Sequence, residues 1–252
     1  MSKAAKRERQ RQNRVARREY EEAVEKRRRF WRSARNLSFF LIPIAVVLVI
    51  VLVRNSGGND KSSANDKTSS TTLPAKQTFA AAPPLTVDPS KTYVATVDTN
   101  QGSFQMTLDP KVAPQTVNSF VFLANQGFYD GLPFHRVVKD FVIQGGDPKG
   151  DGTGGPGYTL PDEPPPNGYE KYSVAMANSG PGTSGSQFFI VTTDAGAKNL
   201  GGPPYLYSAL GKVTSGTDTI DKINKLGSTA SSPSAQKPTK PVTIDKVTIT
   251  QS

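Results

Sequence analysis

The 252-residue chain contains no cysteine, and it has only one histidine and one tryptophan. Without cysteine it can form no disulfide, no thiol nucleophile and no cysteine-ligated zinc site. His135 is the only imidazole, and no Gly-x-Ser-x-Gly motif is present, so the sequence does not support a serine hydrolase. The composition favours a function that needs neither a thiol nor a cluster of histidines.

Two further ligand sites are excluded by their context. Residues 150–155 spell Gly-x-Gly-x-x-Gly, but Pro156 follows directly and no helix begins there, so a dinucleotide site is not expected. A calcium loop fails in the same region because Lys149 stands where an oxygen ligand is needed. The sequence therefore predicts no metal and no cofactor.

The net charge of +10 is concentrated at the N-terminus. Residues 1–36 carry 14 Lys or Arg and 5 Asp or Glu, whereas residues 37–252 carry 17 and 16. Residues 3–35 contain no Gly or Pro and predict a helix. This basic tail favours a signal that only sets membrane topology, and the alternative is binding to anionic lipid or RNA. No nucleic-acid partner is expected for the rest of the chain.

The long uncharged run at residues 37–53 predicts a transmembrane anchor, because about 17–25 apolar residues span a bilayer as a helix. A buried core helix and a cleaved signal peptide are the alternatives. A signal peptide ends at a small-residue cleavage site, whereas Arg54 follows here. We expect a single-pass protein of the plasma membrane, as in a bacterium. The positive-inside rule then puts residues 1–36 in the cytoplasm and the C-terminal domain outside.

The C-terminal part predicts a linker followed by one mainly β domain. Residues 54–90 are rich in Ser, Thr, Asp, Ala and Pro and predict a flexible linker. In residues 91–252, short alternating segments predict strands, and two segments with apolar residues every three to four positions predict helices at 114–125 and 217–226. Several short strands together with two helices are typical of a closed barrel. The expected strands lie at 93–98, 103–108, 134–138, 141–144, 173–177, 187–192, 209–213 and 241–250.

Two long motifs carry the functional signal. The first is Phe134-His135-Arg136-Val137-Val138 followed by Phe141-Val142-Ile143-Gln144-Gly145-Gly146-Asp147, and the second is Met176-Ala177-Asn178-Ser179-Gly180-Pro181 followed by Gly185-Ser186-Gln187-Phe188-Phe189-Ile190. In this order and spacing they resemble the cyclophilin family of peptidyl-prolyl cis-trans isomerases, over roughly residues 91–252. The resemblance implies a closed barrel of eight antiparallel strands with an α-helix over each end.

Rotation about an X-Pro bond needs no nucleophile, metal or proton carrier. Its barrier of about 18–20 kcal/mol arises from amide resonance. A guanidinium fixed near the prolyl nitrogen stabilises the twisted amide more than the planar one, which is the requirement for catalysis. Arg136 matches the family's essential arginine, although taken alone it also fits a surface arginine. Gln144 matches the glutamine that holds a substrate carbonyl and positions the arginine. His135 matches a histidine that lines the family's substrate groove and does not transfer protons.

The resemblance also implies a set of substrate-binding residues. Phe134 lies two residues before Arg136, so both side chains face one side if this segment is a strand. Leu200 matches a leucine of the family's pocket. The remaining expected residues are Phe141, Val142 and Phe189 in the proline pocket, Ala177, Asn178 and Ser179 along the substrate backbone, and Gln187 in the groove.

One departure from the family concerns the pocket wall. The family carries a tryptophan directly before the leucine matched by Leu200, and this tryptophan also contacts the cyclic inhibitor cyclosporin. Here the only tryptophan is Trp31. The family's second groove histidine falls at Tyr205 or Tyr207, depending on where an insertion is placed.

The sequence therefore predicts a membrane-anchored isomerase that binds proline-containing segments of exported or cell-surface proteins and assists their folding. Two other classes stay open. One is a proline-peptide binding module or chaperone with little catalytic activity, which the missing tryptophan favours. The other is a tethered structural domain.

Overall fold

The computed structural model describes residues 77–230 and 236–252. The expected basic tail, the expected anchor at residues 37–53 and the first part of the expected linker lie outside this range. Within the described residues, no helix is both long and apolar enough to cross a membrane.

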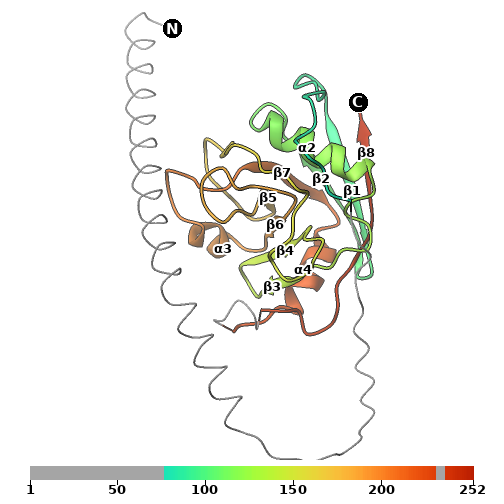
Figure 1. Ribbon diagram of the computed structural model, residues 1–252. Coiled ribbons are helices and arrows are strands. Elements are labelled where there is room, and N and C mark those ends of the chain that lie inside the picture. The colour runs from blue at the N-terminus through green and yellow to red at the C-terminus, as the bar shows by residue number, and fades with distance from the viewer. Residues whose placement is uncertain (1–76, 231–235) are drawn as a thin grey trace, which may run out of the picture. The chain divides into compact units, whose positions relative to one another are not determined.

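Eight antiparallel strands form one sheet in the order β3-β4-β6-β5-β7-β2-β1-β8 (Figure 1). The mainly β prediction is confirmed, and the expected strands at the two ends of the domain are present with small shifts of their bounds. The strands are β1 (Tyr93–Thr99), β2 (Gly102–Leu108), β3 (Arg136–Val138), β4 (Val142–Gly145), β5 (Ser173–Met176), β6 (Phe188–Val191), β7 (Ala209–Ser215) and β8 (Ile244–Gln251).

The sheet does not close into the barrel that the sequence predicts. β3 and β8 are its edge strands and do not pair with each other. The chain before β3 is joined to the residues around the start of β8 by an isolated bridge between Pro133 and Thr243 and by a few backbone hydrogen bonds, such as that from the Phe134 N–H to the Val242 carbonyl at 2.9 Å. β3 has three residues, and the proline before it has no N–H for a ladder. On the other edge, the Val247 N–H donates to the Asp130 carboxylate at 3.1 Å instead of to a strand. The result is a half-barrel.

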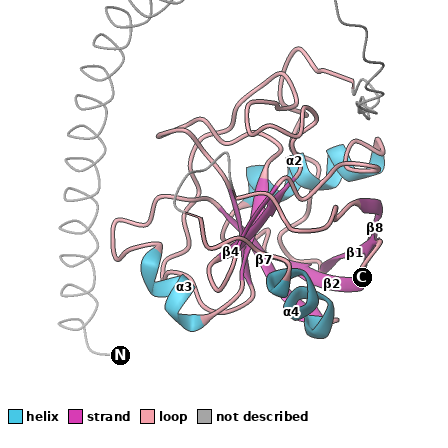
Figure 2. Cartoon of the chain, turned by 90° about the horizontal axis from the view of Figure 1, so that it is seen from below, coloured by secondary structure: helices cyan, strands magenta, loops and turns pink. Residues whose placement is uncertain are grey.

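Three helices are present in the described part of the chain: α2 (Pro114–Asn125), α3 (Asp194–Asn199) and α4 (Thr217–Lys225). The helices expected near 114–125 and 217–226 are α2 and α4, which lie above and below the strands in the view of Figure 2 and both bury apolar side chains in the main core. α3 was not expected. Its N-terminus is capped by the Thr193 hydroxyl, which accepts a hydrogen bond from the Gly196 N–H at 2.9 Å.

Alternation along β6 divides the apolar side chains between two clusters. Phe188 is fully buried in the main core, where its ring meets those of Phe120, Tyr129 and Phe134 edge to face. Phe189 points to the other face of the sheet, as successive strand residues do. There it belongs to a smaller cluster that also contains Val142, Ala175, Val191 and Ala197.

The segment before β1 packs on α2. Asn118 accepts a hydrogen bond from the Thr86 N–H at 2.8 Å and donates one to the Pro84 carbonyl at 2.9 Å. The Phe79 ring meets the Phe122 ring edge to face, with centroids 5.0 Å apart. The sequence places a flexible linker up to residue 90, but residues 77–90 make these contacts with the domain because Asn118 pairs their backbone polar groups.

Candidate active site

Arg136 and Gln144 are brought together by strand pairing. β3 and β4 pair in a register that sets these two residues opposite each other, and the Arg136 Nη1 donates to the Gln144 Oε1 at 3.0 Å. Burial lowers the pKa of Arg136, and nearby Tyr207 partly offsets this. A guanidinium stays protonated in proteins, so the site contains a fixed, half-buried positive charge.

A cavity of about 220 Å³ adjoins this guanidinium. Its walls come from β3, β4, β6, the loop after β5, and the segments that follow α3. Nine residues expected from the sequence meet here. They are Arg136, Phe141, Val142, Gln144, Ala177, Asn178, Phe189, Leu200 and Tyr207.

The floor of the cavity is apolar because β4 and β6 turn small and aromatic side chains to the same face. Val142 is 2% exposed, and Phe189 is 4% exposed. The Phe189 ring meets the Tyr207 ring edge to face, with centroids 5.2 Å apart. A compact apolar ring held in this cavity would therefore lie beside the Arg136 guanidinium.

A second cavity of about 840 Å³ continues from the first and shares Gln144, Ala177 and Asn178 with it. Ser179 and Gln187, both expected substrate-binding residues, line this part. Together the two cavities form what we call the groove.

The glycine-rich loop at residues 150–155 forms one wall of the groove. The Gln187 Nε2 donates to the carbonyls of Gly152 and Gly154 at 3.0 and 2.9 Å, and the Gln187 Oε1 accepts from the Gln144 Nε2 at 3.0 Å. The sequence analysis considered this loop only as a dinucleotide motif. Its function as a wall was missed, although its unusual glycine content marks it.

Asn178 offers free backbone groups to the groove. The Ala177 N–H donates to the Gln187 carbonyl at 2.9 Å, and the Ser179 N–H donates to the Thr183 hydroxyl at 2.9 Å. Between them, the Asn178 N–H and C=O have no hydrogen-bond partner among the described residues. An extended peptide backbone can pair with them.

Phe134 does not line the groove, so this prediction is wrong. Its side chain is 1% exposed in the main core, where its ring contacts Phe188 and Gly145. The reason is that β3 begins at Arg136, and strand alternation does not extend back to Phe134.

His135 lines neither cavity of the groove, which differs from the groove histidine expected from the resemblance. Both ring nitrogens are buried without a hydrogen-bond partner in the described part of the chain. Burial lowers the pKa of His135, and the Asp147 carboxylate opposes this shift. The imidazole is therefore mainly neutral at pH 7.

The two tyrosines that the sequence left as alternatives lie in different places. Tyr207 lines the smaller cavity. Tyr205 does not, because its ring lies over Gly168 and meets the Tyr169 ring edge to face at 5.7 Å. The Tyr169 hydroxyl holds Tyr207 by donating to its carbonyl at 2.8 Å and accepting from its N–H at 2.9 Å.

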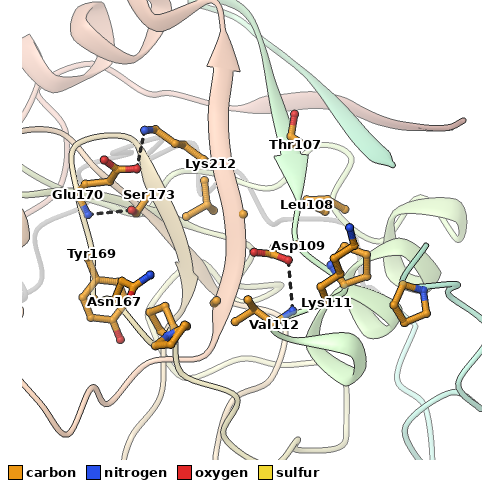
Figure 3. Close-up of a pocket in the computed structure, with 18 of the residues that line it drawn as sticks. Thr107, Leu108, Asp109, Lys111, Val112, Asn167, Tyr169, Glu170, Ser173 and Lys212 are labelled. Carbon is orange, nitrogen blue, oxygen red and sulfur yellow. Dashed lines mark hydrogen bonds and ion pairs between the residues drawn. The ribbon is translucent and has the colours of Figure 1, made fainter. Parts of the chain in front are cut away.

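A separate cavity of about 540 Å³ shares no lining residue with the groove (Figure 3). Lys212 and Glu170 form an ion pair at its edge, with 2.6 Å between Nζ and Oε1. Tyr169 is the residue of this cavity that also touches the groove wall, through Tyr207. The sequence gives no signal for this cavity.

Comparison with known proteins gives consistent matches. The family described as "Cyclophilin type peptidyl-prolyl cis-trans isomerase/CLD" matches residues 94–249. A peptidyl-prolyl cis-trans isomerase of Helicobacter pylori is 46% identical over 138 residues, which cover 53% of this chain and 82% of that protein. Peptidyl-prolyl cis-trans isomerase A of Mycobacterium tuberculosis is 39% identical over 186 residues, covering 66% and 96%.

A solved structure is similar as well. It is a cyclophilin type peptidyl-prolyl cis-trans isomerase of Cryptosporidium parvum, crystallised in the presence of the dipeptide Ala-Pro. The two chains are 29% identical with a TM-score of 0.55, over 62% of this chain and 98% of that one.

Proposed function

The chain belongs to the cyclophilin-type peptidyl-prolyl cis-trans isomerase family, and we propose that it accelerates X-Pro rotation in exported or cell-surface proteins while they fold. The isomerase activity itself follows from the family match and from relatives that are 39–46% identical. The observation that supports our assignment of the site is the Arg136 guanidinium, which is bonded to Gln144 at the mouth of an apolar cavity.

The chemistry we assign to Arg136 is electrostatic. The uncatalysed reaction takes tens to hundreds of seconds because rotation breaks amide conjugation. As the amide twists, its nitrogen regains a lone pair and becomes a better hydrogen-bond acceptor. A guanidinium held near this nitrogen binds the twisted state more tightly than the planar state, and this difference lowers the barrier.

The other residues of the groove would hold the substrate on both sides of the rotating bond. The proline ring would enter the cavity floored by Val142 and Phe189, while the preceding backbone pairs with Asn178. The Gln144 amide has a second N–H besides the one that it gives to Gln187. That hydrogen is available for a substrate carbonyl.

Catalysis is tested on the full-length chain by exchange NMR with a panel of X-Pro peptides. We expect acceleration by the wild type and a loss of roughly 10²- to 10³-fold in the Arg136→Ala variant. Lys139→Ala is the matched control, because Lys139 is exposed beside β3. A folded Arg136→Ala variant with a near-normal rate would contradict the mechanism.

The same experiment separates a second candidate function, a proline-peptide binding module. The observation that favours it is the wall at Leu200 and Tyr207, where the family's tryptophan is absent. If the wild type binds the peptides without accelerating their isomerisation, the binding module is the better description.

We place the domain outside the plasma membrane, with the basic tail in the cytoplasm. This proposal is supported by the uncharged run at residues 37–53 and by the excess of basic residues before it. In that position the tail would meet anionic lipid at the inner surface. Protease added to intact spheroplasts should remove the domain and spare the tail. A protected domain would overturn the proposal.

A further inference from the structure

Arg136 has a second glutamine partner far away in the sequence. Its Nε donates to the Gln236 Oε1 at 2.6 Å, across a separation of 100 residues. Gln236 is 7% exposed. It lies after α4, outside both motifs that carry the family resemblance.

Gln236 is itself anchored at two points that do not involve Arg136. Its side-chain Nε2 donates to the Ala230 carbonyl at 2.9 Å. Its backbone carbonyl accepts from the Val137 N–H at 2.8 Å. The acceptor for the guanidinium is therefore fixed both by Ala230 and by β3.

The two glutamines hold the guanidinium from two sides. Gln236 takes the Nε hydrogen and Gln144 takes one hydrogen of Nη1. A planar group bonded at two of its nitrogens cannot turn about its own axis. Both hydrogens of Nη2 and the second hydrogen of Nη1 stay available to a substrate.

Both acceptors are neutral amides. Within the described residues, no salt bridge to Arg136 is present. The guanidinium is thus oriented without being neutralised, and its full charge remains available to stabilise a developing lone pair.

We propose that Gln236 is a positioning residue for isomerisation, which fixes the Arg136 guanidinium in the orientation that meets the twisted prolyl nitrogen. This inference rests on the function proposed for Arg136. Gln236 lines neither cavity of the groove, so it acts through Arg136 and not on the substrate.

The test compares Gln236→Leu with wild type in the full-length chain, using exchange NMR with a peptide that contains one Ala-Pro bond. Leucine has a similar volume but offers no acceptor to Nε. We expect the catalysed rate in the bound state to fall roughly ten- to hundredfold, since small misplacements of a catalytic group have effects of this size. Peptide affinity should change less than about twofold, because the cavity lining is intact.

Gln236→Glu separates the hydrogen bond that positions the guanidinium from the hydrogen bond to the Ala230 carbonyl. It keeps an acceptor for the Arg136 Nε but cannot donate to the Ala230 carbonyl. A carboxylate at this position also neutralises part of the guanidinium charge, so we expect the rate of Gln236→Glu to fall below that of wild type. Its Arg136 Nε–H should nevertheless keep slow hydrogen exchange, whereas in Gln236→Leu this exchange should be fast. If peptide affinity falls in parallel with the rate in Gln236→Leu, or if the Arg136 Nε–H exchanges as slowly in Gln236→Leu as in wild type, the role of Gln236 is structural and the proposal is overturned.

A double-variant cycle distinguishes failure of this inference from failure of the proposed mechanism. In an Arg136→Ala background, Gln236→Leu should cause no further loss of rate. If Arg136→Ala retains activity, both ideas fall. If Arg136→Ala is inactive while folded Gln236→Leu retains full activity, only the role of Gln236 is refuted.

Discussion

The Tyr207 ring stands edge-on to the Phe189 ring, with their planes at 87° and their centroids 5.2 Å apart. Both residues line the cavity beside Arg136. The pair gives this cavity an aromatic wall although the tryptophan of the family is absent. The ring that builds it comes from the loop before β7, several residues beyond the place where the tryptophan would stand.

We predict weak inhibition by cyclosporin. In the family, the tryptophan supplies a flat apolar wall and an N–H donor to this ligand, and neither Leu200 nor Tyr207 has an N–H in its side chain. Losing a buried aromatic contact at a binding hot spot costs about 1–4 kcal/mol, or about five- to a thousandfold in affinity. Titration of the inhibitor against the isomerase activity measures this. Inhibition at low-nanomolar concentration would show that Tyr207 replaces the missing contact.

Tyr169→Phe should loosen the Tyr207 wall. The Tyr169 hydroxyl makes two hydrogen bonds to the Tyr207 backbone, and burial raises its pKa, so it stays protonated. Removing it leaves two partly buried backbone groups unpaired, at a cost of about 1–3 kcal/mol in unfolding free energy.

The matched control for Tyr169→Phe is Tyr205→Phe, because Tyr205 lies outside the cavity and packs through its ring. Urea unfolding measures the stability of both variants, and the KM for X-Pro peptides reports on the wall. Equal effects of the two substitutions would contradict the assigned role of the Tyr169 hydroxyl.

The pattern of apolar residues predicts much of this fold, because the periods of strands and helices can be recognised within short stretches of sequence. The strand expected at residues 187–192 is β6, and its alternation explains why Phe188 is buried in the main core while Phe189 lines the cavity. The pattern failed at Phe134, where the strand starts two residues later than expected. It also missed α3, whose six residues are too few for an apolar stripe to be recognised.

The site is predictable only as far as it lies within contiguous motifs. Arg136 and Gln144 are eight residues apart and pair through adjacent strands, so the resemblance finds both. Gln236 is brought to Arg136 by the path of the chain after α4, and no local pattern marks it. The choice between Tyr205 and Tyr207 depends on loop geometry, which the sequence does not specify.

His135 should make the stability depend on pH. Burial lowers its pKa below the usual 6.5, so the folded state resists a proton that the unfolded state accepts. The unfolding free energy should therefore not depend on His135 above about pH 6.5. It should decrease as the pH falls from 6.5 toward the lower pKa of His135 in the folded state. As the only histidine, it gives an NMR titration that is easily assigned.

Urea unfolding at pH 7.5 and 5.5 tests this prediction when wild type is compared with His135→Phe. The variant should lose part of the difference in stability between the two pH values. Asp88 and Asp151 have pKa values lowered below 3.8 and titrate outside this range. A folded-state titration of His135 at or above pH 6.5 would refute the argument.

Glu163→Ala should destabilise the domain through the N-terminus of α2. The N-cap residue Ala113 has no side-chain acceptor, and Glu163 replaces it from a distant loop. Its carboxylate accepts from the N–H groups of Gln115 and Thr116 at 3.2 and 2.8 Å, and from the Thr116 hydroxyl at 2.8 Å. Its negative charge also suits the positive end of the helix dipole.

Because Thr116 is fully buried, water does not replace the lost acceptor, and we expect a cost of about 1–3 kcal/mol in unfolding free energy. Glu170→Ala is the matched control. It removes a glutamate whose ion pair with Lys212 is exposed, and such pairs contribute about 0–1 kcal/mol. The loop should keep its path in Glu163→Ala, because the backbone of residue 163 is bonded to Ser208 and Ala209. Isomerase activity per folded molecule should stay unchanged, since α2 lines no part of the groove. Equal stability losses in the two variants would show that α2 does not depend on this cap.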